Sequence, residues 1–324
     1  MVDNWPCVRY ICRKIEGVSM ERKKIKALLE LPLAELISKA DEVRRKTLGA
    51  KLELCNIMNA KSGMCPEDCR FCAQSSRHAT NISRYPLKSK REIVKAATRA
   101  KEIGAHRFDI VTSGESLSKN DLNKVIDAVK EIKERIGIAM CASLGKLDEE
   151  SLALLKNAGL SRYHHNIETS PRYFPKIVTT HSFQERIDTI RAAKRAGLEV
   201  CSGGIIGMGE AWDDRIDMAL ILKELDVDSV PLNILVPIKG TPFEDADQIS
   251  PTDAIKTIAI FRIVLKDKLI KVAAGRESVL KDFQGMAFMA GANGMLIGGY
   301  LTIEGRDLSD DRTLVEEIKR TWTA

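Results

Sequence analysis

Eight short apolar segments, separated by longer segments of helical period, constrain the fold of this chain more than any other feature. They cover residues 52–58, 108–112, 138–143, 163–167, 198–206, 230–235, 270–274 and 295–298. Each is too short for a stable helix and has the length of a buried strand. Parallel strands joined by helices are buried on both faces, and eight such units close into a barrel. The predicted fold is therefore α/β, a (β/α)8 TIM-type barrel over about residues 50–300.

Helix start signals stand between these strands. Ser89 is followed by Glu92, and Ser182 by Glu185, at the spacing of a capping box, in which each residue satisfies a free backbone N–H group. Pro251, which follows a serine, stands at a favourable first helical position. The signals predict helices after the strands, as a barrel requires.

Helical segments flank the barrel on both sides. Residues 21–48 form a charged amphipathic segment that we expect to cap the barrel bottom, and residues 309–322 have the pattern of a closing C-terminal helix. We therefore expect one domain over residues 21–324. Residues 1–20 are interpreted as a possible N-terminal extension, to which the residue pattern gives no role.

Composition excludes several classes of protein. The 324 residues include 51 basic and 45 acidic side chains but no basic block with interleaved aromatic residues, so we expect no nucleic-acid partner. The chain has no apolar run of about 18 residues and no secretory signal pattern, so we expect a cytoplasmic protein without a membrane partner. In that compartment, the eight cysteines favour metal binding or catalysis over disulfides.

Three of these cysteines, Cys65, Cys69 and Cys72, directly follow the first predicted strand. The loops at this end of a barrel strand carry the chemistry of such enzymes. A structural zinc site needs four ligands, and the nearest further candidate, His78, is a single residue. Ordinary [4Fe–4S] sites also take four cysteines. Three at this spacing predict a [4Fe–4S] cluster with one iron open to a small ligand. The alternative is a non-catalytic iron–sulfur or zinc-binding protein.

The motif CxxxCxxC, with Phe71 before its last cysteine, resembles the signature of the radical S-adenosylmethionine (SAM) superfamily. The resemblance implies that the open iron binds the amino and carboxylate groups of SAM. Reduction then cleaves SAM to methionine and a 5′-deoxyadenosyl radical, which abstracts hydrogen from unactivated carbon. An enclosed barrel interior suits this chemistry because it excludes water and positions the target C–H bond.

Longer blocks of sequence resemble the biotin synthase family. They include CPEDCRFCAQSSRH, YHHNIETSPRYF and VPLNILVPIKGTPF, and the resemblance covers about residues 25–320. It implies sulfur insertion into dethiobiotin, with an auxiliary iron–sulfur cluster as sulfur donor. It also implies an electron donor such as flavodoxin or ferredoxin, and a homodimer. The alternative within the superfamily is a hydrogenase-cofactor maturase or a methylornithine synthase.

The auxiliary cluster of this family is commonly a [2Fe–2S] cluster held by three cysteines and one arginine. By resemblance, Cys141, Cys201 and Arg276 match, but Asp109 stands where the third cysteine is usual. Cys55, on the first predicted strand, is a plausible replacement, because residues of alternate strands share one interior layer of a barrel. The cluster is then [2Fe–2S] or a larger variant. The alternatives are a Cys55 that is only a small buried residue, and a salt bridge for Arg276.

The resemblance also assigns contacts to SAM and to dethiobiotin. The amide of Asn233 offers both a donor and an acceptor to the ureido ring, although it could instead satisfy barrel backbone. Arg186 matches a residue that receives the SAM carboxylate, although it could be an exposed helical residue. The predicted SAM contacts are Phe71, Gly114, Glu115, Asn166, Glu168, Arg186 and Ile205, and the predicted substrate contacts are Asn166, Asn233 and Arg276.

Overall fold

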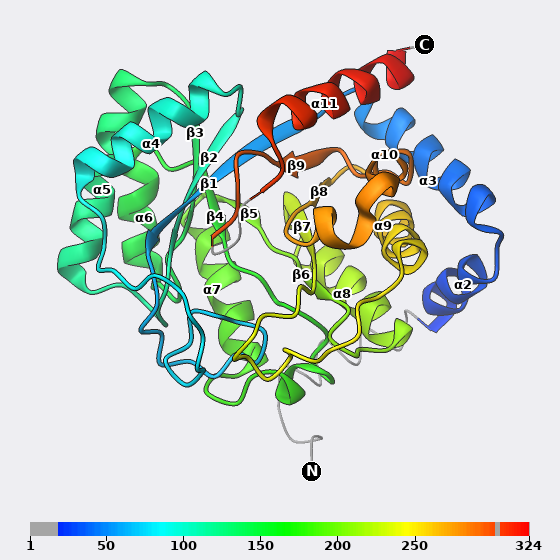
Figure 1. Ribbon diagram of the computed structural model, residues 1–324, viewed down its shortest axis with the longest axis horizontal. Helices are drawn as coiled ribbons and strands as arrows, with labels where there is room; N and C mark the ends of the chain where they lie inside the picture. Colours follow the sequence, from blue (N-terminus) through cyan, green and yellow to red (C-terminus); the bar gives the residue numbers. More distant parts are fainter. Residues whose placement is uncertain (1–18, 302–304, 324) are drawn as a thin grey trace.

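The computed structural model describes residues 19–301 and 305–323. One sheet of short strands forms its centre, with helices around it (Figure 1). The predicted extension over residues 1–20 lies outside the described residues, apart from its last two positions. The strands are β1 (Glu53–Lys61), β2 (Arg107–Thr112), β3 (Ala139–Ser143), β4 (Arg162–His164), β5 (Glu199–Cys201), β6 (Gly204–Ile206), β7 (Ser229–Ile234), β8 (Leu269–Val272) and β9 (Gly294–Leu296).

The sheet closes on itself. Its strand order is β5-β4-β3-β2-β1-β9-β8-β7-β6, and a further pairing of Cys201 with Ser229 joins β5 to β7. Neighbouring strands run parallel throughout the described sheet. The predicted (β/α)8 barrel is therefore confirmed.

The predicted strand at 198–206 is present as two short strands, β5 and β6, with Ser202 and Gly203 between them. Both strands pair with β7, so they share one position in the barrel wall. A Cβ atom at Gly203 would lie 1.9 Å from the carbonyl oxygen of Pro231. Only glycine allows the two backbones to approach so closely at this interruption.

Helices follow the strands, and the predicted start signals are confirmed. Ser89 and Ser182 form complete capping boxes, and Ser250 caps a helix whose first residue is Pro251. The helices of the barrel are α4 (Lys90–Glu102), α5 (Lys119–Arg135), α6 (Glu149–Ala158), α7 (Phe183–Arg195), α8 (Trp212–Glu224), α9 (Pro251–Leu265) and α10 (Gln284–Met289). Shorter helical turns are η1 (Phe174–Lys176), η2 (Arg276–Leu280), which is a π-helix, and η3 (Lys281–Phe283).

The segment before the barrel forms two helices, α2 (Ser19–Leu29) and α3 (Leu33–Leu48), because Pro32 lies between them and interrupts helical hydrogen bonding. We expected this segment at the barrel bottom, but it packs against the outer side of α8 and α9. The closing helix is confirmed as α11 (Leu308–Thr323), whose Trp322 ring lies 4.0 Å below the Arg44 guanidinium.

Strand residues alternate between the barrel interior and the surrounding helices. On β2, Asp109 and Val111 line the interior, whereas Phe108 and Ile110 are fully buried in the core that joins the sheet to the helices. This period of two decides which side chains reach a central site. None of the described helices is both long and apolar enough to cross a membrane.

Candidate active site

One cavity of about 400 Å³ runs from the barrel interior to the loops that follow β1, β2 and β3. It collects residues that are far apart in the sequence. Arg276 is the one predicted site residue that does not line it. The predicted residues that do are Cys55, Cys65, Cys69, Phe71, Cys72, Gly114, Glu115, Cys141, Asn166, Glu168, Arg186, Cys201, Ile205 and Asn233.

Backbone hydrogen bonds fold the loop that carries Cys65, Cys69 and Cys72. The N–H of Cys65 donates to the carbonyl oxygen of Gln74 at 3.1 Å, and the carbonyl of Cys65 accepts from the N–H of Ser76 at 2.7 Å. Burial raises the pKa of all three thiols, that of Cys72 to about 11. The loop thus carries three thiols with raised pKa values, and a thiol must lose its proton to bind a metal.

Two acidic residues tie this loop to the segment before α7. The carboxylate of Asp68 accepts from the backbone N–H groups of Thr179 at 2.9 Å and Thr180 at 3.2 Å. Although burial opposes it, these hydrogen bonds hold the pKa of Asp68 well below its usual range. The carboxylate of Glu67 contacts His181 and Thr180. The cysteine loop is therefore fixed to the barrel at its outer edge.

His78, the nearest histidine after the three cysteines, does not join them as a ligand. Its Nδ1 lies 2.9 Å from the carbonyl oxygen of Cys72, and its side chain does not line the cavity. A four-ligand zinc site built with His78 therefore has no support in this loop.

Arg186 on α7 meets Asn166 and Glu168 in the cavity wall. Its Nη1 donates to the carbonyl oxygen of Asn166 at 3.0 Å and lies 3.7 Å from Glu168 Oε1, and its Nε donates to His181 at 3.0 Å. The Arg186 side chain is only 12% exposed, so it is not the solvated helical residue considered as an alternative. Burial raises the pKa of Glu168, against the pull of Arg186. Opposite charges thus face the cavity beside the cysteine loop.

Lys146 positions Glu115 at the cavity mouth. Its Nζ lies 2.5 Å from Glu115 and 2.7 Å from Glu185. Gly145 permits the contact, because its φ is +81° and a Cβ there would lie 2.1 Å from the carbonyl oxygen of Glu115. The loops after β2 and β3 are therefore closely packed where Glu115 is held.

Asn233 on β7 lines the cavity, but both ends of its amide bind strand backbone. Its Nδ2 donates to the carbonyl oxygen of Gly204 at 3.3 Å, and its Oδ1 accepts from the N–H of Ala274 at 3.1 Å. This is the alternative role considered for Asn233. The side chain is half-buried and also faces the cavity.

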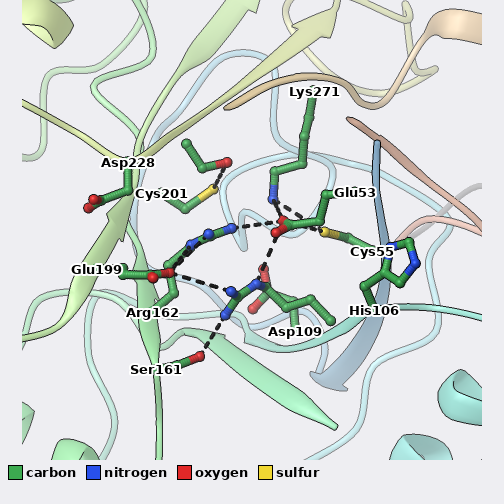
Figure 2. Close-up of polar contacts among 12 residues, drawn as sticks. Glu53, Cys55, His106, Asp109, Ser161, Arg162, Glu199, Cys201, Asp228 and Lys271 are labelled. Carbon is green, nitrogen blue, oxygen red and sulfur yellow. Dashed lines mark hydrogen bonds and ion pairs between the residues drawn. The ribbon is translucent and has the colours of Figure 1, made fainter. Parts of the chain in front are cut away.

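A second group of thiols lies deeper in the barrel. Cys55 on β1, Cys141 on β3 and Cys201 on β5 are each no more than 2% exposed, and all three line the cavity. Figure 2 shows Cys55 and Cys201 among charged side chains of the barrel interior. The three cysteines thus line the same cavity, and a shared cluster site stays a prediction.

The three deep thiols differ in their electrostatic surroundings. Burial raises the pKa of Cys55 to about 12, and burial together with the nearby carboxylate of Asp109 raises that of Cys141. Burial also opposes ionisation of Cys201, but the positive charges of Lys271, His164 and Arg162 outweigh it and lower the pKa of this thiol. Of the three deep thiols, Cys201 therefore ionises most readily.

Five charged side chains surround these thiols at the N-terminal end of the barrel, and we call them the charged layer: Glu53, Arg107, Arg162, Glu199 and Lys271. Arg162 donates to Glu53 and to Glu199, in each case at 2.9 Å. Arg107 lies 3.4 Å from Glu199. The Nζ of Lys271 donates to Cys55 Sγ at 3.4 Å (Figure 2). The deep thiols therefore face cations.

Asp109 also lines the cavity beside these thiols. It pairs in register with Cys141, and its carboxylate lies 3.0 Å from Nδ1 of His164. Burial opposes protonation of His164, but the charge of Cys201 and the hydrogen bond to Asp109 raise its pKa to about 9. The position thus holds a carboxylate and imidazole pair.

The structure does not bring Arg276 to the cysteines. Its guanidinium is 2% exposed and binds both carboxylate oxygens of Asp311 on α11 at 2.8 Å, together with Gln284 at 2.5 Å. Its Nε donates to Tyr300, whose side chain lines the cavity in its place. Arg276 therefore forms a salt bridge, which was the alternative to its role as a ligand. Asp311 is its main partner, and Glu277 lies 3.3 Å from the guanidinium. We therefore remove Arg276 from the predicted ligands and substrate contacts.

Sequence analysis gave no role to Lys271, Arg162 or Arg107. A signal was present, because Lys271 interrupts an otherwise apolar strand and is two residues from Ala273, which also faces the interior. Charged residues on the inward face of a buried strand need a partner or a ligand. Lys271 lies within the strand predicted at 270–274 and meets that test, whereas Arg107 and Arg162 stand one position before the strands predicted at 108–112 and 163–167 and escape it.

Two family models together match most of the chain. The Radical SAM superfamily model covers residues 61–222, and the Biotin and Thiamin Synthesis associated domain covers residues 231–320. Strands from both regions form the one barrel. The barrel and its cysteine loop define an enzyme of the radical SAM superfamily, and this implies a [4Fe–4S] cluster and SAM. Curated relatives narrow the class further. The chain belongs to the biotin synthase family.

The relatives match over nearly their whole length. A biotin synthase of Thermotoga petrophila is 50% identical over 297 residues, 91% of this chain and 98% of the relative. That of Pelotomaculum thermopropionicum is 47% identical over 312 residues, 96% of this chain and 97% of the relative. That of Geobacter sulfurreducens is 45% identical over 313 residues, 95% of this chain and 95% of the relative.

Solved structures support the fold. The crystal structure of a methylornithine synthase matches with a TM-score of 0.80 and 25% identity, over 95% of this chain and 94% of that one. A maturase of the [FeFe]-hydrogenase matches with a TM-score of 0.77 and 17% identity, over 91% of this chain and 70% of that one. The latter likeness shows the fold alone.

Proposed function

We propose that this enzyme converts dethiobiotin to biotin by radical SAM chemistry, with sulfur supplied by an auxiliary cluster at Cys55, Cys141 and Cys201. The observation that carries the proposal is that two separate groups of three thiols line one cavity. A radical formed at the mouth and a sulfur donor held deeper then have a shared space between them for the substrate. The proposal is also supported by the family of the chain.

Cys65, Cys69 and Cys72 are the proposed ligands of the [4Fe–4S] cluster. Among the described residues, no group of three or more His, Cys, Asp or Glu side chains is placed so that it could hold a metal ion. The fit therefore rests on three sulfur donors in one folded loop that line one end of the cavity. When bound, such a cluster supplies the electron that cleaves SAM to methionine and a 5′-deoxyadenosyl radical.

The cavity wall beside the cluster loop offers complementary charge to SAM. Glu115 provides a carboxylate for the amino group, and Arg186 provides a guanidinium for the carboxylate. Asn166 and Glu168 offer acceptors and a donor for ribose hydroxyls. Phe71 and Ile205, which also line the cavity, add the apolar contacts.

The deep thiols are the proposed auxiliary ligands, in a [2Fe–2S] cluster or a larger variant. Their donor chemistry fits an iron–sulfur cluster, which is held by thiolates. Lys271 and Arg162 supply positive charge to offset the charge of those thiolates. Arg276 is excluded from this proposal by its ion pair with Asp311.

Dethiobiotin is the proposed substrate, in the space between the two thiol groups. Asn233 and Asn166 are the proposed amide contacts of its ureido ring, and both line the cavity. The chain's own task is to exclude water from this volume and to hold the reacting carbons near the radical. The proposed partners are an electron donor such as flavodoxin or ferredoxin, and a second copy in a homodimer.

The test is an anaerobic assay of the reconstituted, reduced protein with SAM and dethiobiotin. We expect 5′-deoxyadenosine and biotin, both measured by mass spectrometry. Formation of 5′-deoxyadenosine without a thiolated product would reject dethiobiotin as substrate and favour another reaction of the superfamily. A protein that binds iron but never cleaves SAM would reject catalysis altogether.

A further inference from the structure

Glu53 is the shared acceptor of three cations in the charged layer. One of its carboxylate oxygens, Oε1, lies 2.9 Å from Arg162, 3.6 Å from Arg107 and 3.7 Å from Lys271. The Glu53 side chain is 15% exposed and those of the three cations are 6% to 9% exposed, so water screens these contacts little. Figure 2 shows the carboxylate between Arg162 and Lys271. Glu53 is thus the one carboxylate of the charged layer that lies near all three cations, whereas Glu199 contacts only the two arginines.

The charges around this carboxylate do not cancel. Three cations face two carboxylates, Glu53 and Glu199, and the side chain of Glu199 is 47% exposed to water. The neighbouring Asp109 is already matched by His164, 3.0 Å away. An excess of positive charge is therefore directed at the thiols of the cavity.

The same carboxylate also contacts sulfur. Cys55 Sγ donates to Glu53 Oε1 at 3.3 Å and accepts from Lys271 Nζ at 3.4 Å. Glu53 is thus in contact both with a proposed cluster ligand and with the cation beside it. Loss of this carboxylate would change the charge at the sulfur and release the cation.

We propose that Glu53 is a positioning residue for the auxiliary cluster, holding Lys271 and Arg162 beside its sulfur ligands and limiting the positive charge that acts on it. The inference rests on the proposed function, because it requires a cluster at the deep thiols. Net charge and hydrogen bonds to sulfur set the reduction potential of an iron–sulfur cluster. Removing the Glu53 charge favours the reduced form, which is more negative, whereas removing the Lys271 charge disfavours it.

The test is a redox titration of the auxiliary cluster in the full-length reconstituted protein. Electron paramagnetic resonance and absorption spectra monitor the reduction of the cluster. Glu53→Gln is expected to favour reduction about tenfold, which corresponds to about +59 mV for one electron. Lys271→Met is expected to shift the potential in the opposite direction by a similar amount. The double variant should return close to the wild-type value, and Glu53→Asp, which keeps the charge, should remain near it.

Asp311→Asn provides a matched control, because it breaks a buried ion pair that lies outside the cavity. We expect it to lower stability without moving the potential. Iron and sulfide content per folded chain is measured for every variant. These readouts separate a charge effect from loss of structure, since damage to the fold would not give shifts of opposite sign.

Shifts of the same sign in Glu53→Gln and Lys271→Met, or no shift in either, would overturn the inference. If Glu53→Gln does not fold, Lys271→Met must still lower the potential while Glu53→Asp leaves it unchanged. A wild-type protein without a second cluster would overturn the proposed auxiliary cluster together with this inference. A protein that makes biotin, with potentials unmoved by either variant, would overturn this inference alone.

Discussion

The carboxylate of Asp311 binds the guanidinium of Arg276 through both of its oxygens, each at 2.8 Å, and both side chains are 2% exposed. This pair joins α11 to the turn after β8. The pair gives Arg276 a structural role and holds its positive charge away from the cavity. A buried ion pair of this kind is costly to break from one side, because the remaining partner stays buried without compensation.

The first prediction concerns this pair. Arg276→Ala should lower the free energy of unfolding by about 3–5 kcal/mol, measured by urea denaturation of the cluster-free protein. Iron bound per folded chain should not change. Arg320→Ala is the control, because Arg320 is exposed and its pair with Glu317 should contribute less than about 1 kcal/mol. Loss of the auxiliary-cluster iron from Arg276→Ala with unchanged stability would return Arg276 to the ligand set.

The second prediction separates the two groups of thiols. Cys55→Ser should remove iron and sulfide in excess of the first cluster and reduce biotin formation to background, while 5′-deoxyadenosine still forms. Cys69→Ser should abolish 5′-deoxyadenosine formation, because it removes a ligand of the cluster that binds SAM. Metal analysis and product quantification check both. Unchanged iron and sulfide in Cys55→Ser would show that Cys55 is only a small buried residue.

The third prediction compares two glycines with positive φ. Gly145→Ala places a Cβ 2.1 Å from the carbonyl oxygen of Glu115, so the loop that carries Glu115 must move and SAM binding should weaken. Gly137 has φ +67° with open space around it, so Gly137→Ala should cost only the backbone strain, about 1–2 kcal/mol. Calorimetric titration with SAM checks the difference. Equal SAM affinity in both variants would argue against a role for Glu115 at the mouth.

The fourth prediction concerns pH and Asp214. Its carboxylate accepts from Ser170 at 2.6 Å and Arg172 at 2.8 Å, and these contacts, against the effect of burial, lower its pKa from the ordinary 3.8. Because the folded pKa is the lower one, the ionised group stabilises the fold above about pH 4, and this contribution is lost as the pH falls through the folded pKa.

Asp214→Asn should therefore lower the free energy of unfolding by about 1–3 kcal/mol at pH 7. The gap to the wild type should narrow as the pH is lowered below about 4. Urea denaturation over this pH range measures it. Glu42→Gln removes an exposed carboxylate that pairs with the exposed Lys46, and should leave stability nearly unchanged. A gap for Asp214→Asn that stays constant with pH would contradict the ionic explanation.

Sequence reasoning predicted the barrel because its signals are local and repeated. Apolar runs of strand length and capping residues such as Ser89 and Ser182 each report on a few neighbouring residues, and every element agrees with the same architecture. The break between α2 and α3 was missed although Pro32 is a known interruption. The packing of these helices against α8 and α9 depends on distant contacts that no local pattern encodes.

The site was predicted best where side chains lie on strands. Cys55, Cys141 and Cys201 follow the inward and outward alternation, so their meeting in the interior could be anticipated. Arg276 lies beyond the end of β8, after Gly275 with φ +84°, where that alternation no longer applies. Its partner Asp311 is 35 residues further along the chain. The alternation of a strand cannot predict whether a side chain beyond a sharp turn points into the barrel or away from it.

The cavity that both groups of thiols line has a consequence for how the proposed clusters would be assembled. Strands enclose the deep thiols on every side of the barrel, and the charged layer lies at its N-terminal end. Iron and sulfide must then arrive from the opposite end, past the loop between Cys65 and Cys72. On the proposed ligand sets, a cluster in that loop would obstruct the route inward, so we expect the innermost site to be filled first.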